Sequence, residues 1–542
     1  MMLLSRLDFP GRCTAFVVMV FLLAWVFFST TRAATLSPMW QLDILEMPTS
    51  PGQRIQVNGV MKDNQFAPSS VEFNIQESTT TVLPALPLGS SLLEFLSVRA
   101  FGVEERVEVV QGKDNELTID CRAGSQTAGV LFTPVSARMP FGAKAALRVL
   151  AQGDAGFEWG VSPAGKDARL LVPVAVANGS LAADISLDRV ATLMPDYRVE
   201  KPSPDVSLLS FTIICPLNTA SLQIRSIELV PAPVAPSGLR AAWVWNAKRW
   251  LEAPGKLVNE ARKLGLQRLY IALDVPASGG DVVNKELLSG FIAMAKRHDI
   301  DIWAVEGDPA MALPSGREHA LQRLQSIHRY QDSVPQSSRL GGIQYDIEPY
   351  LLPDYRANPQ ETGRQWAQTL QVLAAQSELK LDMVLPFWLP QSPMATAVLG
   401  GLSETADSIT IMAYRTAEPV IQQVAEPLLS WGSAKGVPVY VALEAGPLPD
   451  DLIQSYIAAE AGKPATLWLL ANAGKGNALR FDKPVLLEQG LGYLEAGQVT
   501  VPASRISFLG ETAAMLNTGR QLQAALRAWA SYAGMVFHGL FD

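Results

Sequence analysis

The fold of the second half of this chain is decided by LQRLYIALDV (266–275), KELLSGFIAMAKRHD (285–299) and IDIWAVEGD (300–308). The pattern predicts an apolar strand, an amphipathic helix and a second apolar strand. The same alternation continues to the end of the chain, with an eighth strand in GMVFHGL (534–540). Because eight strands alternate with helices, we expect a parallel (β/α)8 or TIM barrel over residues 239–542. An open doubly wound sheet is the alternative, and the lack of a glycine-rich turn after the first strand weakens it.

The first half of the chain has a different rhythm. Short runs that alternate apolar and polar residues, such as NELTIDC (115–121) and LSFTIIC (209–215), are separated by turn residues. This predicts an all-β domain over residues 34–232, a jelly-roll-like β-sandwich that is either carbohydrate-binding or purely structural. A proline-rich linker follows at 233–238. A β-rich excursion interrupts the barrel at about residues 449–505.

The N-terminus has the layout of an export signal. Two arginines, Arg6 and Arg12, precede the apolar run CTAFVVMVFLLAWVFF (13–28), and small residues stand at Thr31 and Ala33. We expect residues 1–33 to be a cleaved signal peptide, with a retained membrane anchor as the alternative. The protein is then exported to the periplasm or the cell exterior, and it meets a membrane only if the segment is retained. In an oxidising compartment Cys121 and Cys215 form a disulfide, or else they are two buried thiols.

Composition narrows the classes of function. The 542 residues suggest two or three domains. The formal net charge of −8 argues against nucleic acid as a partner, because phosphate binding needs a basic surface. Three cysteines and four histidines leave little for a metal centre, and no phosphate loop, HExxH or CxxC motif is present. We therefore expect no cofactor and no metal.

The fourth barrel strand, GGIQYDIEPY (341–350), carries the strongest functional signal. A period of two places Gln344, Asp346 and Glu348 on one face. A parallel barrel strand is normally almost continuously apolar, so three polar side chains on one face must either pair with one another or line a solvent-filled site. In TIM barrels the active site lies at the carboxyl ends of the strands, where this stretch ends.

Other strand ends are polar as well. Strand six ends with Tyr414 and Arg415, strand seven with Glu444 and strand eight with His538. Carboxylates that converge around a cleft can divide the roles of acid and of nucleophile or base, which is what glycosidic bond cleavage requires. Structural alternatives remain open: Glu348 could pair with Arg415 or His538, and His538 could be a core histidine.

Two further groups of residues stand near the same strand ends. Glu306 and Asp308 follow strand three, and for them a helix cap or loop charge is the favoured interpretation. Trp245 and Trp388 follow strands one and five, and we expect them to offer flat apolar faces to sugar rings. The predicted partner is therefore a carbohydrate.

The stretch GGIQYDIEPY resembles the DxxDxDxE signature of family 18 glycoside hydrolases, the chitinase-like barrels. Asp346 and Glu348 match its last two positions, whereas Gly341 and Gln344 replace the first two acids. IMAYR (411–415) is similar to the family's MxYD motif, with Arg415 in place of the acid. The resemblance implies that the acetamido group of the substrate attacks, oriented by Asp346 and Tyr414, while Glu348 is the acid.

A second resemblance is to the retaining glycosidases of clan A. Their acid/base glutamate ends strand four and their nucleophile glutamate ends strand seven, which corresponds to Glu348 and Glu444 here, although Ile347 replaces the usual asparagine. Both resemblances imply Glu348 as acid/base and disagree on its partner. The sequence thus predicts an exported, retaining glycoside hydrolase acting on a poly- or oligosaccharide. The alternative is a non-catalytic glycan-binding or polysaccharide-assembly protein on a degenerate barrel.

Overall fold

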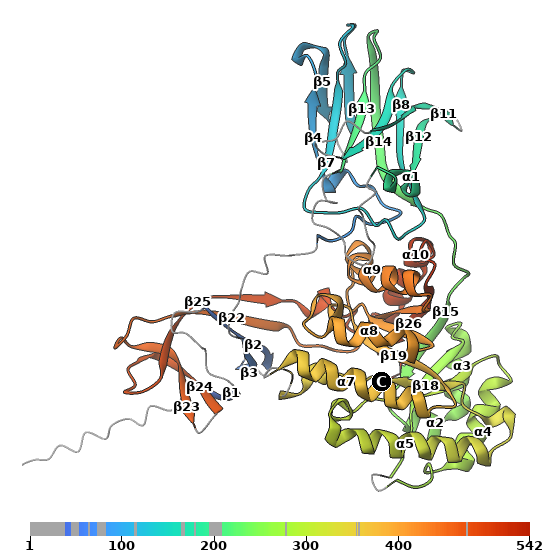
Figure 1. Cartoon of the computed structure of the whole chain (residues 1–542), viewed down its shortest axis with the longest axis vertical. Helices are drawn as coiled ribbons and strands as arrows, with labels where there is room; N and C mark the ends of the chain where they lie inside the picture. Colours follow the sequence, from blue (N-terminus) through green and yellow to red (C-terminus); the bar gives the residue numbers. More distant parts are fainter. Residues whose placement is uncertain are drawn as a thin grey trace, which may run out of the picture.

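A computed structural model describes residues 38–44, 54–62, 65–72, 83–112, 116–163, 169–177, 180–193, 209–276, 279–353, 355, 358–472 and 475–541. The expected leader at residues 1–33 lies outside this described part. Within it, no helix is long and apolar enough to cross a membrane. Figure 1 shows a β domain above a helix-ringed barrel, and a narrow sheet that projects from the barrel.

Eight parallel strands close into a barrel, which confirms the predicted architecture of the second half. The last strand pairs in parallel with both the seventh and the first, so no edge is left open. The strands are β15 (Leu239–Val244), β16 (Arg268–Ala272), β17 (Asp301–Glu306), β18 (Gly342–Tyr345), β19 (Lys380–Pro386), β20 (Ser408–Met412), β21 (Val439–Glu444) and β26 (Tyr532–His538).

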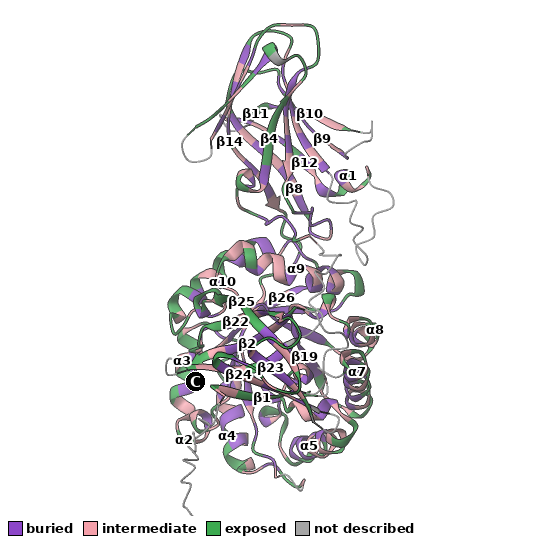
Figure 2. Ribbon diagram, turned by 90° about the vertical axis from the view of Figure 1, so that its left-hand side faces the viewer, coloured by how far each residue is buried: buried purple, intermediate pink, exposed green. Residues whose placement is uncertain are grey.

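Helices between these strands form a ring around the barrel (Figure 2). They are α2 (Lys248–Glu252), α3 (Pro254–Lys263), α4 (Lys285–Lys296), α5 (Pro314–Ser333), α7 (Pro359–Gln376), α8 (Ala395–Thr405), α9 (Glu418–Lys435) and α10 (Thr512–Leu526). Helix α7 illustrates why they form. The Asn358 side chain caps its first turn by accepting from the Glu361 N–H at 3.1 Å, and Trp366, Leu370 and Leu373 recur on one buried face.

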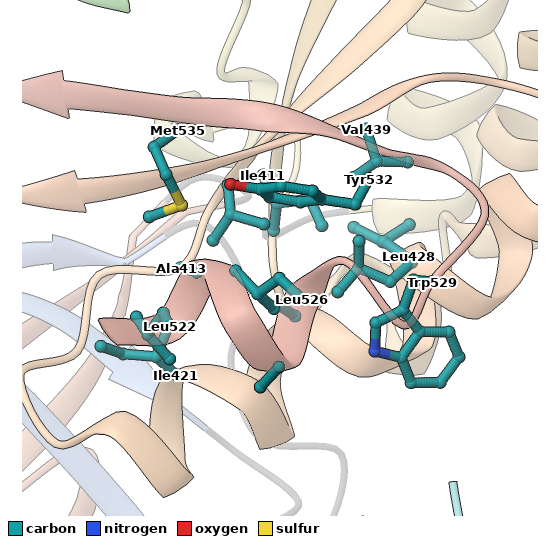
Figure 3. Packing of buried hydrophobic residues seen from close by; sticks show 14 of the residues in the cluster. Ile411, Ala413, Ile421, Leu428, Val439, Leu522, Leu526, Trp529, Tyr532 and Met535 are labelled. Atoms are coloured by element: carbon teal, nitrogen blue, oxygen red, sulfur yellow. The ribbon is translucent and has the colours of Figure 1, made fainter. Parts of the chain in front are cut away.

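Barrel strands alternate between an interior and an outer apolar layer. On β17, Trp303 and Val305 belong to the interior cluster, whereas Ile302 and Ala304 face the helices. The outer layer is continuous where α9 and α10 cover β20, β21 and β26. Figure 3 shows this packing among Ile411, Ala413, Ile421, Leu428, Val439, Leu522, Leu526, Trp529, Tyr532 and Met535.

The N-terminal β domain consists of two antiparallel sheets. One has the order β10-β9-β13-β7-β4 and the other β11-β12-β8-β14-β6-β5. Their strands are β4 (Leu96–Phe101), β5 (Val107–Gln111), β6 (Leu117–Cys121), β7 (Gly129–Pro134), β8 (Ala145–Gly153), β9 (Glu158–Pro163), β10 (Leu170–Pro173), β11 (Ala175–Ala177), β12 (Ser180–Ser186), β13 (Leu209–Ile214) and β14 (Ala220–Pro231). A short helix, α1 (Leu187–Ala191), follows β12.

A disulfide between Cys121 and Cys215, with Cα atoms 5.9 Å apart, joins the ends of β6 and β13. Because these strands belong to different sheets, the bond ties the two sheets together. This decides between the disulfide and the two buried thiols that the sequence left open.

The β domain rests on helix α9 of the barrel. Arg138 makes a bidentate ion pair with Glu426 of α9, in which Nη1 lies 3.1 Å from Oε1. Both side chains are buried. Next to it the Gln422 amide exchanges hydrogen bonds with the backbone of Leu88 at 2.8 and 3.0 Å. The apolar core is continuous from this domain into the barrel. This buried ion pair, in which Nε of Arg138 is left without a partner among the described residues, joins the domain to the barrel wall.

A third sheet combines strands from residues 40–72 with strands from the excursion, residues 451–501. Its order is β1-β24-β23-β25-β22-β2-β3. The strands are β1 (Trp40–Ile44), β2 (Ile55–Lys62), β3 (Gln65–Glu72), β22 (Asp451–Ala458), β23 (Ala465–Asn472), β24 (Lys475–Val485) and β25 (Leu491–Val501). Residues 40–72 therefore pair with the excursion, which differs from the expectation that 34–232 forms one domain. Local alternation predicts a strand but does not name its partner, since pairing depends on distant residues.

The root of this third sheet lies at the carboxyl end of the barrel. The chain leaves β21 at Glu444, enters β22 at Asp451, and returns from β25 so that the Phe508 N–H donates to the Glu444 carbonyl at 2.8 Å. The sheet stands in front of the ring of helices in Figure 2 and projects to one side of it in Figure 1. It therefore faces the barrel end that carries the polar strand termini.

Candidate active site

A buried polar cluster lies inside the barrel, centred on Asp382. Its carboxylate accepts hydrogen bonds from Gln344 Nε2 at 2.7 Å and from the Ser408 and Thr410 hydroxyls at 2.6 Å each. Gln344 also accepts from Trp243 Nε1 at 2.5 Å, and its side chain is fully buried. Gln344 is thus a positioning residue beneath the mouth, a placement that does not fit the substrate contact predicted for it. The period of two gives the direction of this side chain but not its depth.

Glu348 lies just beyond β18, beside an aromatic pair. The Tyr350 hydroxyl donates a hydrogen bond to Glu348 Oε1, and the Tyr350 ring packs edge-to-face on Trp388 with centroids 4.9 Å apart. Burial raises the pKa of Glu348, although the Tyr350 hydrogen bond and the charge of His538 oppose this. A carboxyl group with a raised pKa keeps its proton to higher pH, as a general acid must.

Asp346 is the second carboxyl group of the pair. Among the described residues, its Oδ1 is buried and has no hydrogen-bond partner. Burial, and then the charge of Glu348, raise the pKa of Asp346 to about 7, against the opposing effect of His538. Two neighbouring carboxyl groups that each disfavour the ionisation of the other can hold one proton between them. Asp346 therefore has both a free acceptor atom and a protonation state that changes near neutral pH.

Glu444 and His538 are in contact at the ends of β21 and β26. Nδ1 of His538 lies 2.6 Å from Oε2 of Glu444, and Oε1 of Glu444 accepts from the Gly446 backbone N–H. The Glu444 side chain is only 5% exposed. The centroid of the His538 ring lies 5.7 Å from that of the Trp243 ring and 6.3 Å from that of the Tyr414 ring. Both oxygens of Glu444 are therefore engaged, Oε2 by His538 and Oε1 by the Gly446 N–H.

Tyr414 and Arg415 follow β20 at the rim of the mouth. Tyr414 packs against the interior cluster, and the Arg415 guanidinium lies over the Phe387 ring with Cζ 4.5 Å from its centroid. Arg415 also donates from Nη1 to the Tyr414 carbonyl at 2.6 Å. Trp245 is half-buried at the end of β15 and packs against the same interior cluster. The structure thus brings the sequence-predicted residues other than Gln344 to one end of the barrel.

Asp308 is a cap, as the favoured interpretation predicts, whereas Glu306 is a buried strand residue in an ion pair rather than a cap or a loop charge. Glu306 points to the outer layer and pairs with Arg323 of α5, with Oε1 and Nη2 3.0 Å apart. Asp308 accepts from the Ala310 N–H at 2.8 Å, which caps a 3-10 turn (Pro309–Ala312). Neither acid belongs to the cluster around Glu348.

Sequence reasoning missed three members of the site. Tyr350 stands two residues after Glu348, so its place in the same motif was an available signal. Asp382 is an acid in the otherwise apolar strand LKLDMVLP (379–386), which marks a buried charge that needs partners. Trp243 carries no such signal, because an aromatic residue in a barrel strand is ordinarily core.

The described residues contain no group of three or more His, Cys, Asp or Glu side chains arranged to hold a metal ion. The chemistry that this arrangement offers is proton transfer between carboxyl groups, aided by an imidazole and two phenols. Flat aromatic rings beside the acids add apolar surface for a ring-shaped ligand.

Comparison with known proteins adds structural neighbours only. No protein family matches the chain by sequence, and no curated protein matches it. An endo-1,4-beta-D-xylanase of Clostridium thermocellum, complexed with xylohexaose, is 9% identical, with 67% of this chain and 82% of the xylanase covered and a TM-score of 0.26. A chitinase from Chromobacterium violaceum is 12% identical, with 56% and 96% covered and a TM-score of 0.32. The spore cortex-lytic enzyme SleL of Bacillus cereus is 9% identical, with 58% and 73% covered and a TM-score of 0.32. These TM-scores are too low to argue from, so the barrel is assigned from its own strand pairing.

Proposed function

We propose that this protein is a glycoside hydrolase whose active site is the mouth of the barrel. The observation that carries the proposal is the pair Asp346 and Glu348, two neighbouring carboxyl groups with raised pKa values at the end of β18. Tyr350 and Trp388 lie directly beside them. An acid kept protonated by burial beside aromatic rings is an arrangement suited to glycosidic bond cleavage.

Glu348 is the general acid/base in this proposal. It gives its proton to the glycosidic oxygen as the bond to the anomeric carbon breaks, and later takes a proton from the water that completes hydrolysis. The freed leaving group departs as an alcohol. The Tyr350 hydroxyl stabilises the ionised Glu348 between these two steps, because it donates to the same carboxylate.

Asp346 is the favoured partner of Glu348. Its carboxyl group retains a buried, unsatisfied acceptor in Oδ1, whereas both oxygens of Glu444 are already engaged, so Asp346 is the acid with hydrogen-bonding capacity left for a substrate N–H. This agrees with the family 18 resemblance, in which the acetamido oxygen of the substrate attacks the anomeric carbon and the configuration is retained. Glu444 then acts through His538, which it orients towards Trp243 and Tyr414. We infer a glycan with N-acetylated sugars as the substrate.

We also infer that the protein is exported and that its two N-terminal sheets pack as a β-sandwich. The disulfide between Cys121 and Cys215 supports both inferences, since disulfides persist in oxidising compartments and this one links the two sheets. Trp159 of β9 supports the sandwich as well. It is fully buried against Phe132 and Phe211, as a residue on the inner face of a sheet would be.

The test is a panel of N-acetylated and other glycans, assayed for new reducing ends with the wild type and the Glu348→Gln variant. Wild-type turnover that falls by at least about a hundredfold in E348Q, with an unchanged melting temperature, supports the proposal. Asp308→Asn is the matched control, because it neutralises an exposed strand-end acid and keeps its capping acceptor. If the wild type binds a glycan of the panel but releases no reducing ends from any, the protein is a non-catalytic binding protein and the proposal is wrong.

A further inference from the structure

Two arginines meet at the rim of the barrel mouth without a carboxylate between them. Arg415 follows β20, and Arg505 ends the short 3-10 turn Ala503–Arg505 that closes the excursion. The two segments are joined by the Thr416 hydroxyl, which donates to the Ser504 carbonyl at 2.7 Å. Burial and the nearby charge of Arg505 lower the pKa of Arg415. Two like charges are thus held together at a position where they repel each other.

The guanidinium of Arg415 is fixed in place but has spare donors. It stacks on Phe387 and uses one N–H for the Tyr414 carbonyl. A guanidinium carries five N–H donors. Among the residues that the structure describes, neither Arg415 nor Arg505 forms an ion pair, and no Arg415 nitrogen is sealed away from solvent without a partner. The remaining donors of Arg415 are therefore available to a ligand.

Two arginines elsewhere in the chain have carboxylate partners, whereas the half-buried Arg240 has none among the described residues. Arg138 pairs with Glu426, and Arg323 pairs with Glu306. Arg415, at the mouth of a protein with a net charge of −8, has no such carboxylate partner among the described residues. Partial desolvation of the guanidinium costs free energy that an arriving anion would recover.

The position of Arg415 relative to the acids is given by the aromatic residues. Glu348 bonds to Tyr350, Tyr350 packs on Trp388, and the residue before Trp388 is the Phe387 on which Arg415 lies. These contacts place Arg415 next to the aromatic residues that border the general acid. A sugar chain that crosses Trp388 from the acid would bring a neighbouring sugar unit to Arg415.

We propose that Arg415 and Arg505 form an anion-binding subsite, and that the glycan accepted by this mouth carries carboxylate groups, as polysaccharides containing uronic acids do. The inference rests on the proposed carbohydrate function. A carboxylate is favoured over other anions because it is planar, so its two oxygens can accept a bidentate pair of hydrogen bonds from a guanidinium. The subsite binds one sugar unit beside the scissile bond and takes no part in proton transfer.

The test measures binding rather than turnover. Isothermal titration uses the E348Q protein, which keeps ligands intact, with oligosaccharides of hyaluronan, unsulfated chondroitin and heparosan, which contain both uronic acids and N-acetylated sugars, and with the carboxyl-reduced form of each. At least one acidic oligosaccharide should bind about tenfold or more tightly than its reduced counterpart. R415Q in the same background should remove that preference, and R505Q should weaken it. Raising the salt concentration should weaken binding of the acidic form only.

Arg240 supplies the matched control. It is also half-buried, lies over a ring with Cζ 5.4 Å from the Phe537 centroid, and has its pKa lowered by burial and by the charge of Arg520. It stands near the start of β15, at the opposite end of the barrel. R240Q should therefore leave every affinity unchanged. Equal losses in R240Q and R415Q would show a general charge effect and overturn the subsite.

Other outcomes separate the subsite from the proposed function. If no acidic oligosaccharide binds more tightly than its reduced form, or if sulfated oligosaccharides of κ-carrageenan alone show the preference, the carboxylate subsite is wrong. If the protein then turns over neutral glycans and R415Q does not change that turnover, the proposed hydrolase function holds and only the subsite is wrong. If an acidic glycan binds through Arg415 but is never cleaved, the subsite is supported and the proposed hydrolase function is wrong.

Discussion

Replacing Asp346 by Asn should make the protein more stable and less active, with a stability gain that depends on pH. The structure raises the pKa of Asp346 from 3.8 to about 7. A rise of about three pH units, at about 1.4 kcal/mol each, corresponds to ~4 kcal/mol by which the ionised carboxylate destabilises the fold. Asparagine has almost the same shape and cannot ionise, so D346N removes this penalty. The figure is an upper limit, since the shift includes the charge of Glu348.

The pH window follows from the two pKa values. Below about pH 4 Asp346 is protonated in both the folded and the unfolded chain, so the variant gains nothing there. Between about pH 4 and pH 7 the unfolded chain loses the proton first, and the wild type is progressively destabilised. Above about pH 7 both states are ionised and the difference is constant. The gain of D346N should therefore grow from pH 4 to pH 7 and then level off.

The assay is urea unfolding at pH 4, 6 and 8, followed by tryptophan fluorescence, for the wild type, D346N and the control D308N. Asp308 is an exposed cap whose acceptor Asn retains, so its variant should show no pH-dependent gain. Glycan turnover by D346N should collapse over the same range. A stability difference between D346N and wild type that is equal at pH 4 and pH 8 would refute the assignment of Asp346 as a buried, strained carboxyl group.

Three further predictions concern other parts of the molecule. Cys121→Ala opens a disulfide that spans 94 residues, and denaturant unfolding of the β domain should show a loss of up to about 4.7 kcal/mol that reducing agent reproduces in the wild type. Glu426→Ala leaves Arg138 buried without its partner and should cost about 3–5 kcal/mol, whereas a normal melting temperature would show that the pair does not hold the domains together. Tyr350→Phe removes a hydrogen bond that lowers the pKa of Glu348, so the basic limb of the pH–rate profile should move to higher pH, and an unmoved limb would remove Tyr350 from the mechanism.

Much of the barrel was predictable because its pattern is local. Strands such as Asp301–Glu306 and helices such as Pro359–Gln376 can each be recognised from the apolar periodicity of one short stretch of sequence. Strand-end residues were predictable for the same reason. In a parallel barrel all carboxyl ends meet at one mouth, so Glu348, Glu444 and His538 could be grouped before any contact was known.

The depth of each side chain in the barrel, and the side chains with which each one pairs, were not predictable from the sequence. Gln344 lies on the predicted face but at a level where Asp382 and Trp243 engage its amide. The pairing of Glu444 with His538 joins residues from two strands far apart in sequence. No local pattern encodes the choice of Asp346 over Glu444, because that choice depends on which oxygens other side chains already occupy.

The sequence by itself determined the barrel, the two regimes of secondary structure and the end of the barrel at which polar side chains gather. Those features depend on periodicity and on the direction of parallel strands, which are properties of short segments. Only the tertiary structure decided that residues 40–72 complete a sheet with residues 451–501, that Cys121 bonds to Cys215, and which acids at the mouth remain free. The physical reason is that strand pairing, disulfide geometry and desolvation each depend on groups that only folding brings within a few ångströms of one another.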